Sequence, residues 1–344
     1  MHGCHRNSKP LEQSITNPPS QHVTADPVLE FRRHALSLSP DVAGLRLDQA
    51  LARLLPQYSR ARLTSWIEAG AVQVDGQRLR PKDRVLGGEQ VRIEAPVVLD
   101  EAVAPEAIAL GVVHQDRVLL VVNKPAGLVV HPGAGNRQHT LQNALLALDP
   151  QLAAIPRAGL VHRLDKDTSG LVLVARTLEA HTALVAALAA REIQRHYLAV
   201  CTGVMTGGGT VDEPIGRHRS QRTRMAVHSG GRPAVTHYRI LRRFRAHTLF
   251  RAELETGRTH QIRVHLAHIG YPLVGDPLYA GRRRVPAGCT PALIAQLEGF
   301  KRQALHAARL RLSHPRTGRE VEWEAPPPED MERLISALEA DQRA

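Results

Sequence analysis

A short segment at residues 159–170 carries the densest set of reactive side chains in the chain. Its ionisable members are two carboxylates and three basic groups, namely Asp165, Asp167, His162, Arg163 and Lys166. The Val- and Leu-rich run at 171–175 follows it and predicts a buried strand. A loop at the end of such a strand is a common place for catalytic groups, and a carboxylate there can serve as nucleophile or general base. The alternative is a solvated turn, in which Thr168 and Ser169 bond to their own backbone.

The sequence His-Arg-Leu-Asp-Lys-Asp-Thr-Ser-Gly-Leu at 162–171 resembles the signature of the RluA family of pseudouridine synthases. Further segments that resemble the family's pattern follow in order along the chain, at 123–127, 195–199, 257–265, 275–279 and 305–307. The resemblance implies an isomerase that converts specific uridines of large-subunit ribosomal RNA into pseudouridine. It places the essential aspartate at Asp165, and spacing alone does not choose between this residue and Asp167.

The same resemblance implies roles for other side chains. Tyr197 would stack on a uridine that is flipped out of the RNA and could take the proton from its C5 position. Arg263 would pair with Asp165 and favour the ionised carboxylate. Arg163 would enter the stack that the uridine leaves. The remaining substrate-binding positions in the catalytic part of the chain are His162, Lys124 and Arg258.

Pseudouridine is an isomer of uridine, so the implied reaction requires no cofactor and no metal ion. The sequence agrees, because it contains neither a P-loop lysine motif nor a Gly-x-Gly-x-x-Gly segment after a strand. Two other classes of protein remain open. A metal site could use His260, His265, His268 and Glu255, although the spacing does not put the three histidines on one helical face. A binding protein of the same fold without catalysis would leave Asp165 dispensable.

Residues 41–95 predict a small α/β module that binds RNA. Helices are expected at about 45–55 and from Ser59 to Gly70, and short strands at 72–74 and 91–93. Arg60 and Arg62 lie in the first turn of the second helix, where the helix dipole disfavours cations, so a phosphate backbone would explain them. The order Arg-Leu-Asp, Ser-Arg and Gly-x-Val-x-Val-x-Gly resembles the RNA-binding module shared by a small-subunit ribosomal protein and tyrosyl-tRNA synthetase.

The predicted organisation has four parts. A flexible tail at 1–40 precedes the module at 41–95, an acidic linker at 96–107 follows it, and the catalytic domain covers 108–344. Within that domain, strands are expected at 118–122, 128–130, 235–240 and 248–252, and helices at 178–190 and 328–338. The first two strands would form a tight antiparallel hairpin. Strands outnumber helices and no βα repeat is evident, so the predicted fold class is α+β with a mixed, largely antiparallel sheet.

Composition agrees with an RNA-directed protein. The chain has 344 residues, with 45 Lys and Arg against 33 Asp and Glu, a formal net charge of +12 that favours a polyanionic partner. Further arginines expected on an RNA-binding surface are Arg217, Arg219, Arg222 and Arg224 and the run 282–284. No Cys-x-x-Cys pair and no apolar run of about 18 residues is present. We therefore expect a cytoplasmic monomer whose partner is ribosomal RNA or an assembling large subunit, with no role for a membrane.

Overall fold

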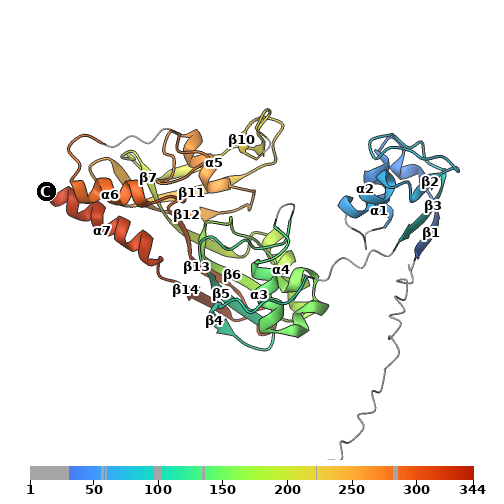
Figure 1. The fold of residues 1–344 in the computed structure, drawn as a ribbon, viewed down its shortest axis with the longest axis horizontal. Helices are drawn as coiled ribbons and strands as arrows, with labels where there is room; N and C mark the ends of the chain where they lie inside the picture. Colours follow the sequence, from blue (N-terminus) through green and yellow to red (C-terminus); the bar gives the residue numbers. More distant parts are fainter. Residues whose placement is uncertain are drawn as a thin grey trace, which may run out of the picture. The chain divides into compact units, whose positions relative to one another are not determined.

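The structure is a computed structural model, and it describes residues 31–55, 58, 60–96, 103–133, 136–221, 223–281 and 286–344. The chain divides between residues 100 and 101 into two compact units, the first drawn in blue in Figure 1 and the second in green to red. Each unit has its own hydrophobic core. The predicted N-cap Ser59, Arg222, the run 282–284 and the tail up to residue 30 lie outside the described residues.

The first unit is a three-stranded antiparallel sheet with two helices. Its strands in spatial order are β1 (Phe31–Ser37), β3 (Gln90–Pro96) and β2 (Val72–Val74). A short 3-10 turn at Pro40–Val42 leads to α1 (Leu47–Leu54), and α2 (Arg60–Glu68) follows. Both helices pack their apolar side chains onto the sheet, so Leu51 and Leu63 share one core with Ile93. The predicted helices and short strands are confirmed.

The prediction of a flexible tail through residue 40 is wrong for residues 31–37. These residues form β1, which pairs with the whole of β3, from Phe31 opposite Pro96 to Ser37 opposite Gln90. The unpaired backbone groups along one edge of β3 need partners, and pairing with them overrides the weak local pattern of this segment. Gly70 has a φ of 75° just after α2, as a glycine that ends a helix does.

The second unit is built on a nine-stranded sheet with the spatial order β4-β5-β6-β13-β7-β12-β11-β8, and β14 pairs with β13. The strands are β4 (Gly111–Gln115), β5 (Leu119–Lys124), β6 (Ser169–Ala175), β7 (Gln194–Thr202), β8 (Gly209–Asp212), β11 (Val235–Arg243), β12 (His247–Leu254), β13 (Leu305–Ser313) and β14 (Glu320–Glu324). Among the pairings of these described strands, only that of β6 with β13 is parallel. The predicted α+β class with a mixed, largely antiparallel sheet is confirmed. A separate ribbon pairs β9 (Ile215–Arg217) with β10 (Met225–Val227).

The helices of the second unit are α3 (Leu141–Leu148), α4 (Leu178–Ala189), α5 (Gln261–His268), α6 (Pro291–Gly299) and α7 (Glu329–Arg343), with short 3-10 turns at Pro150–Ala154 and Pro156–Gly159. Successive residues of a strand point to opposite faces of its sheet. Val172 of β6 therefore packs in the same cluster as Leu145 of α3, whereas Leu173 packs with Leu184 of α4. All seven residues of β6 are buried, which confirms the predicted strand. The predicted final helix is longer than expected and ends at Arg343.

The predicted hairpin between 118–122 and 128–130 is wrong. The neighbours of β5 in the sheet are β4 and β6, and residues 128–130 form only an isolated bridge between Val129 and Thr140. The buried ammonium group of Lys124 donates to the carbonyl oxygens of Pro125, Leu128 and Lys166, each at 2.9 Å. The chain wraps around this cation instead of turning back along β5, because both edges of β5 are already occupied.

Candidate active site

The loop that carries Asp165 is held at both ends by glycines. Gly159 and Gly170 have positive φ angles of 78° and 116°. A Cβ at Gly159 would collide with the carbonyl oxygen of Ala175, and one at Gly170 with the backbone of Ala307, so neither position accepts a side chain. These close backbone approaches tie the loop to β6 and β13, which are rigid parts of the sheet.

The end of the loop is not a solvated turn. Thr168 and Ser169 are buried, and their side chains bond to distant segments instead of their own backbone. Gln303 Nε2 donates to Thr168 Oγ1 at 2.9 Å, and Ser169 Oγ lies 2.9 Å from His306 Nδ1. His306 Nε2 in turn lies 3.0 Å from the carbonyl oxygen of Ala325. The loop is therefore fixed from the β13 side, and Asp165 has a defined place.

Asp165 shares an arginine with a second carboxylate that is far away in sequence. Arg263 of α5 donates from Nη1 to Asp165 Oδ2 at 3.0 Å. The same guanidinium donates from Nε and Nη2 to the two oxygens of Asp276, at 2.7 and 2.9 Å. The Asp276 side chain is fully buried, and that of Asp165 retains 16% of its exposure. Burial acts to lower the pKa of Arg263, but the hydrogen bonds and charge of Asp276 outweigh it and raise the pKa above its ordinary value. Arg263 is thus a permanent cation beside Asp165.

His260 and Tyr279 form a second contact with the same carboxylate. His260 Nε2 lies 4.0 Å from Asp165 Oδ1, and His260 Nδ1 lies 2.8 Å from the Tyr279 hydroxyl. The backbone N–H of Met225 donates to that hydroxyl at 2.9 Å, so we infer that the phenol gives its own proton to Nδ1. Burial lowers the pKa of His260, while the charge of Asp165 opposes this effect. A neutral imidazole then directs Nε2–H at the carboxylate.

A cavity of about 680 Å³ opens in front of Asp165. The side chains that sequence reasoning assigned to the site and that line it are His162, Arg163, Asp165, Tyr197, Arg258 and Arg263. Asp167 does not line this cavity and lies at another one, beside Arg302 and Asp330. Spacing in the sequence could not distinguish Asp165 from Asp167. The structure does, because only Asp165 of the two faces this cavity.

Tyr197 lies on β7 and is 6% exposed. Burial raises the pKa of its phenol, and the charge of Arg195 opposes this effect. The ring is protonated at neutral pH, and it is placed in the same cavity as Asp165. This environment suits stacking against a base better than it suits accepting a proton.

His162, Arg163 and Arg258 meet the cavity in different ways. Arg163 lines the cavity and its side chain is exposed to solvent, so a ligand that arrives from solvent can contact it. Arg258 donates from Nε to the carbonyl oxygen of Pro233 at 3.0 Å, so part of its guanidinium is already used. His162 Nε2 accepts from the backbone N–H of Leu173 at 3.0 Å. Burial, followed by the charge of Arg195, lowers the pKa of His162 to about 3, so this ring is neutral.

Lys124 is misplaced in the sequence-based set of substrate-binding residues. Its side chain is fully buried, and its three hydrogen bonds to carbonyl oxygens use all three protons of an ammonium group. Burial lowers its pKa to about 7, with Asp167 and Asp165 opposing the effect. Lys124 therefore holds the Asp165 loop against β5 from inside the protein and has no donor left for RNA.

Arg60 and Arg62 belong to the first unit, where Arg60 has a structural partner that the sequence did not reveal. Its Nη2 donates to Asp48 Oδ2 at 2.6 Å, and Arg46 Nε donates to Asp48 Oδ1 at 3.1 Å. The Asp48 side chain is 4% exposed, so the two arginines neutralise a buried charge on α1. The placement of Arg60 against the helix dipole is explained by this pair, and a role of Arg60 and Arg62 in RNA binding stays a prediction.

The three histidines considered as metal ligands have other partners or lie apart. His265 is buried, with Nδ1 2.9 Å from Thr236 Oγ1 and Nε2 2.9 Å from the carbonyl oxygen of Glu213. In the described ranges, no group of three His, Cys, Asp or Glu side chains is arranged to hold a metal ion. Nor does any helix of the described chain have the length and apolar character needed to cross a membrane.

The sequence alone did not identify the residues that hold the catalytic side chains in place, such as Asp276 and Tyr279. Asp276 and Tyr279 lie in the segment 275–279, which was recognised only as part of a pattern. His260 and Arg195 lie in the family segments 257–265 and 195–199, but the sequence suggested only a metal-binding role for His260 and no role for Arg195. The signal for Asp276 and Tyr279 was their place in a family motif, but their partners Arg263 and His260 could be identified only from the fold.

Comparisons with known proteins match two parts of the chain to protein families. Residues 118–268 match the family described as RNA pseudouridylate synthase, and residues 45–91 match the S4 domain. The chain is 59% identical over 299 residues to ribosomal large subunit pseudouridine synthase D of Yersinia pestis, with 87% of this chain and 92% of that protein covered. It is 56% identical over 306 residues to the protein of the same name from Escherichia coli strain K12, with 89% and 94% covered.

A solved structure is similar to the second unit. Human RNA pseudouridylate synthase domain containing 4 superposes with a TM-score of 0.53 at 27% sequence identity. The match covers 67% of this chain and 93% of that chain.

Proposed function

This chain belongs to the RluA family of pseudouridine synthases and carries an S4 domain before its catalytic domain. On that premise we propose that it converts specific uridines of large-subunit ribosomal RNA into pseudouridine and that Asp165 is its catalytic carboxylate. The enzyme is an isomerase. The observation that carries the proposal is the position of Asp165, which faces a cavity of about 680 Å³ while Arg263 holds its carboxylate.

The reaction breaks the C1′–N1 bond of a uridine and forms a C1′–C5 bond. The Asp165 carboxylate either attacks C1′ or removes a proton from C2′, and in both routes the bonding pair leaves with the base. The base then turns so that C5 meets C1′, and the C1′–C5 bond forms as Asp165 leaves C1′ or returns its proton to C2′. The C5 proton is then lost to a basic group in the cavity, and N1 takes up a proton. Substrate and product have the same atoms, so the cycle needs no oxidant, nucleotide or metal ion.

The uridine reaches this cavity only after it leaves the RNA stack, which costs a few kcal/mol. Tyr197 offers a ring on which the flipped base can lie, and its protonated phenol supports this stacking role over that of a base. Arg163 is exposed beside the cavity, where it can take the vacated place in the RNA. The cavity is formed by one chain, which supports action as a monomer, and ribosomal RNA as substrate supports action in the cytoplasm.

The S4 domain supports binding of the same RNA from the first unit. We propose that Arg62, with Arg60 partly engaged by Asp48, contributes phosphate contacts there. Arg217, Arg219 and Arg224 surround the β9–β10 ribbon and would add contacts in the second unit. Each phosphate contact releases counterions, so affinity for large-subunit RNA should fall steeply between low and moderate salt. A nearly flat salt dependence would contradict this surface.

The function is tested by tritium release. Large-subunit RNA that carries uridine tritiated at C5, and immature large subunits made with the same RNA, are incubated with the wild type, Asp165→Asn and Asp167→Asn. We expect release by the wild type and by Asp167→Asn, and none by Asp165→Asn, while all three bind the RNA equally. Asp167→Asn is a matched control, because it removes a carboxylate two residues away that does not line the cavity.

Other outcomes contradict different parts of the proposal. Release by Asp165→Asn and not by Asp167→Asn would move the essential carboxylate to Asp167. Release from neither substrate by the wild type, together with tight binding of RNA, would favour a binding protein that keeps the family's sequence without its chemistry.

A further inference from the structure

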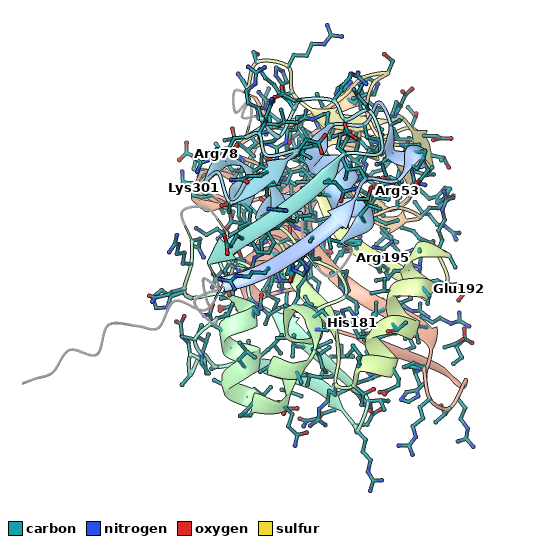
Figure 2. The ribbon with its side chains drawn as sticks, turned by 90° about the vertical axis from the view of Figure 1, so that its right-hand side faces the viewer. Arg53, Arg78, His181, Glu192, Arg195 and Lys301 are labelled. Carbon is teal, nitrogen blue, oxygen red and sulfur yellow. The ribbon has the colours of Figure 1, made fainter. Side chains whose placement is uncertain are left out.

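Arg195 is a buried cation for which no ion pair is found among the described residues. It lies on β7 and is 8% exposed, and Figure 2 labels it together with Glu192, beyond the end of α4. Within the part of the chain that the structure describes, its Nε has no hydrogen-bond partner. Its hydrogen bond there is a long one of 3.4 Å, from Nη2 to the carbonyl oxygen of Leu254. A buried guanidinium without a carboxylate carries a large desolvation cost, which usually means that its partner arrives with a ligand.

The guanidinium lies in the cavity that Asp165 faces. Arg195 and Tyr197 are two residues apart on one strand and line this cavity. His196 and Leu198 do not line it and instead line another cavity, which Tyr197 also borders. The charge of Arg195 also contributes to the low pKa of His162 and opposes the rise in the pKa of Tyr197. Its charge therefore acts at the place where the flipped base would lie.

The neighbouring acids of the cavity are already engaged. Glu255 accepts from Arg191 and lies 2.7 Å from His237 Nε2, and Asp165 accepts from Arg263. Gly257 leaves space for Arg195, because a Cβ at that position would lie 3.0 Å from Arg195 Nη1. The backbone of Gly257 does not have a positive φ, so a glycine is not needed here for its backbone conformation. Its lack of a side chain is what leaves room for Arg195. Of the two buried arginines that line the cavity, Arg263 is paired with carboxylates, whereas no described carboxylate forms an ion pair with Arg195.

We propose that Arg195 binds the uracil anion that forms when the C1′–N1 bond of the flipped uridine breaks. This inference rests on the proposed function. When the bond breaks, its electron pair stays on N1 and delocalises onto the O2 and O4 carbonyl oxygens, while C1′ bonds to Asp165 or C2′ loses a proton to Asp165. Arg195 donates its unused N–H groups to these oxygens, holds the base during its turn, and releases it when C5 bonds to C1′.

The base is a better partner for Arg195 than a backbone phosphate. Phosphates of a docked RNA reach the rim of the cavity, where the exposed side chains of Arg157, Arg163 and Arg191 lie. Arg195 is more than nine-tenths buried, next to the tyrosine on which the base would stack. A donor that meets negative charge only after the bond breaks stabilises the transition state more than the bound substrate.

The test compares Arg195→Met and Arg195→Lys with the wild type in single-turnover reactions at saturating enzyme, alongside the affinity of each for the same RNA. We expect Arg195→Met to bind RNA within about threefold of the wild type and to react about 10²-fold more slowly, with partial recovery in Arg195→Lys. Gly257→Ala should slow the reaction less than Arg195→Met does, because its Cβ would lie 3.0 Å from Arg195 Nη1 and shift the guanidinium slightly. Because a buried unpaired charge is removed, Arg195→Met should unfold at equal or higher denaturant concentration.

A second substrate separates charge stabilisation from a loss of structure. 5-Fluorouracil is a more acidic leaving group than uracil. When the C1′–N1 bond of a 5-fluorouridine breaks, the base anion therefore depends less on stabilisation by Arg195. The loss of intact 5-fluorouridine, measured by nuclease digestion and chromatography, should be slowed less by Arg195→Met than the loss of uridine is. Equal slowing of both substrates, or weaker RNA binding with an unchanged rate at saturation, would overturn the inference. Turnover of uridine by the wild type in the same series shows that the proposed function holds whichever result is found.

Discussion

Arg263 donates a hydrogen bond to Asp165 at 3.0 Å although the two residues are 98 positions apart. The remaining donors that face the protein interior are taken by Asp276, which binds Nε and Nη2 in a two-point contact. Such a fork fixes the plane of the guanidinium, so that Nη1 is directed at Asp165. The direction of the proposed catalytic carboxylate is thus set by a residue that does not line the cavity.

Asp276→Asn tests this positioning. The amide keeps an oxygen for the backbone N–H groups of Leu278 and Tyr279, but it loses the charge and one acceptor for Arg263. We expect RNA affinity to be unchanged and the single-turnover rate to fall about 10- to 100-fold, or roughly 1.4 to 2.7 kcal/mol of transition-state stabilisation. Asp330→Asn is the matched control, since Asp330 binds Arg302 in the same two-point manner away from the cavity. Equal rates in both variants would refute the role of Asp276.

Lys124→Met tests the structural role of the buried lysine. The variant removes the donor to three carbonyl oxygens, and only that of Lys166 keeps a backbone donor, the N–H of Gly127 at 3.0 Å, among the described residues. At a cost of about 1–3 kcal/mol for each of the other two, we expect the free energy of unfolding of the catalytic unit to fall by about 2 kcal/mol or more in denaturant titrations of the full chain. Lys166→Met changes an exposed lysine of the same loop and should shift it by less than about 0.5 kcal/mol. A Lys124→Met protein of normal stability with weakened RNA binding would restore the sequence-based assignment.

Arg60→Gln tests the ion pair on α1. The Asp48 carboxylate is buried, and loss of Arg60 removes its 2.6 Å contact, so the first unit should lose about 1–3 kcal/mol of stability. Arg53→Gln breaks a pair with Asp41 in which both side chains are more than half exposed, and it should cost less than about 1 kcal/mol. Thermal unfolding of the full chain, followed by hydrogen exchange in residues 31–96, distinguishes the two. Similar losses in both variants would mean that Asp48 is not the source of the difference.

His247 should make the second unit sensitive to acid. It is 2% exposed, and burial lowers its pKa from 6.5 to about 4, with Asp341 opposing the effect. Between these two values the unfolded chain binds a proton that the folded chain does not, so the free energy of unfolding falls as the pH drops from 6.5 to 4. His247→Gln should reduce the loss between pH 7.5 and 4 by about 3 kcal/mol.

The control for this titration is His268→Gln, because His268 is exposed on α5. Urea unfolding at a series of pH values compares the slope of stability against pH in the three proteins. A slope in His247→Gln that matches the wild type would show that His247 titrates normally in the folded state.

Local features of the amino-acid sequence determined much of the fold. The apolar run at 171–175, bounded by Gly170, identified the buried strand β6, and the Ala- and Leu-rich run at 178–190 identified α4. These predictions depend on neighbours a few positions away, which is the range over which helix and strand periodicity acts. The family signature at 162–171 likewise identified the reaction, because a ten-residue match needs no knowledge of the fold.

The tertiary structure alone decided which side chains act together. Asp165 and Asp167 are equivalent by spacing, and only in the folded chain does Asp165 meet Arg263 at the cavity while Asp167 lines another one. Lys124 reads as a polar residue of a surface turn, yet three carbonyl oxygens enclose it, one of them from Lys166. Contacts of this kind join segments that are distant in the sequence, and no local pattern records them, since they exist only once the sheet has brought those segments together.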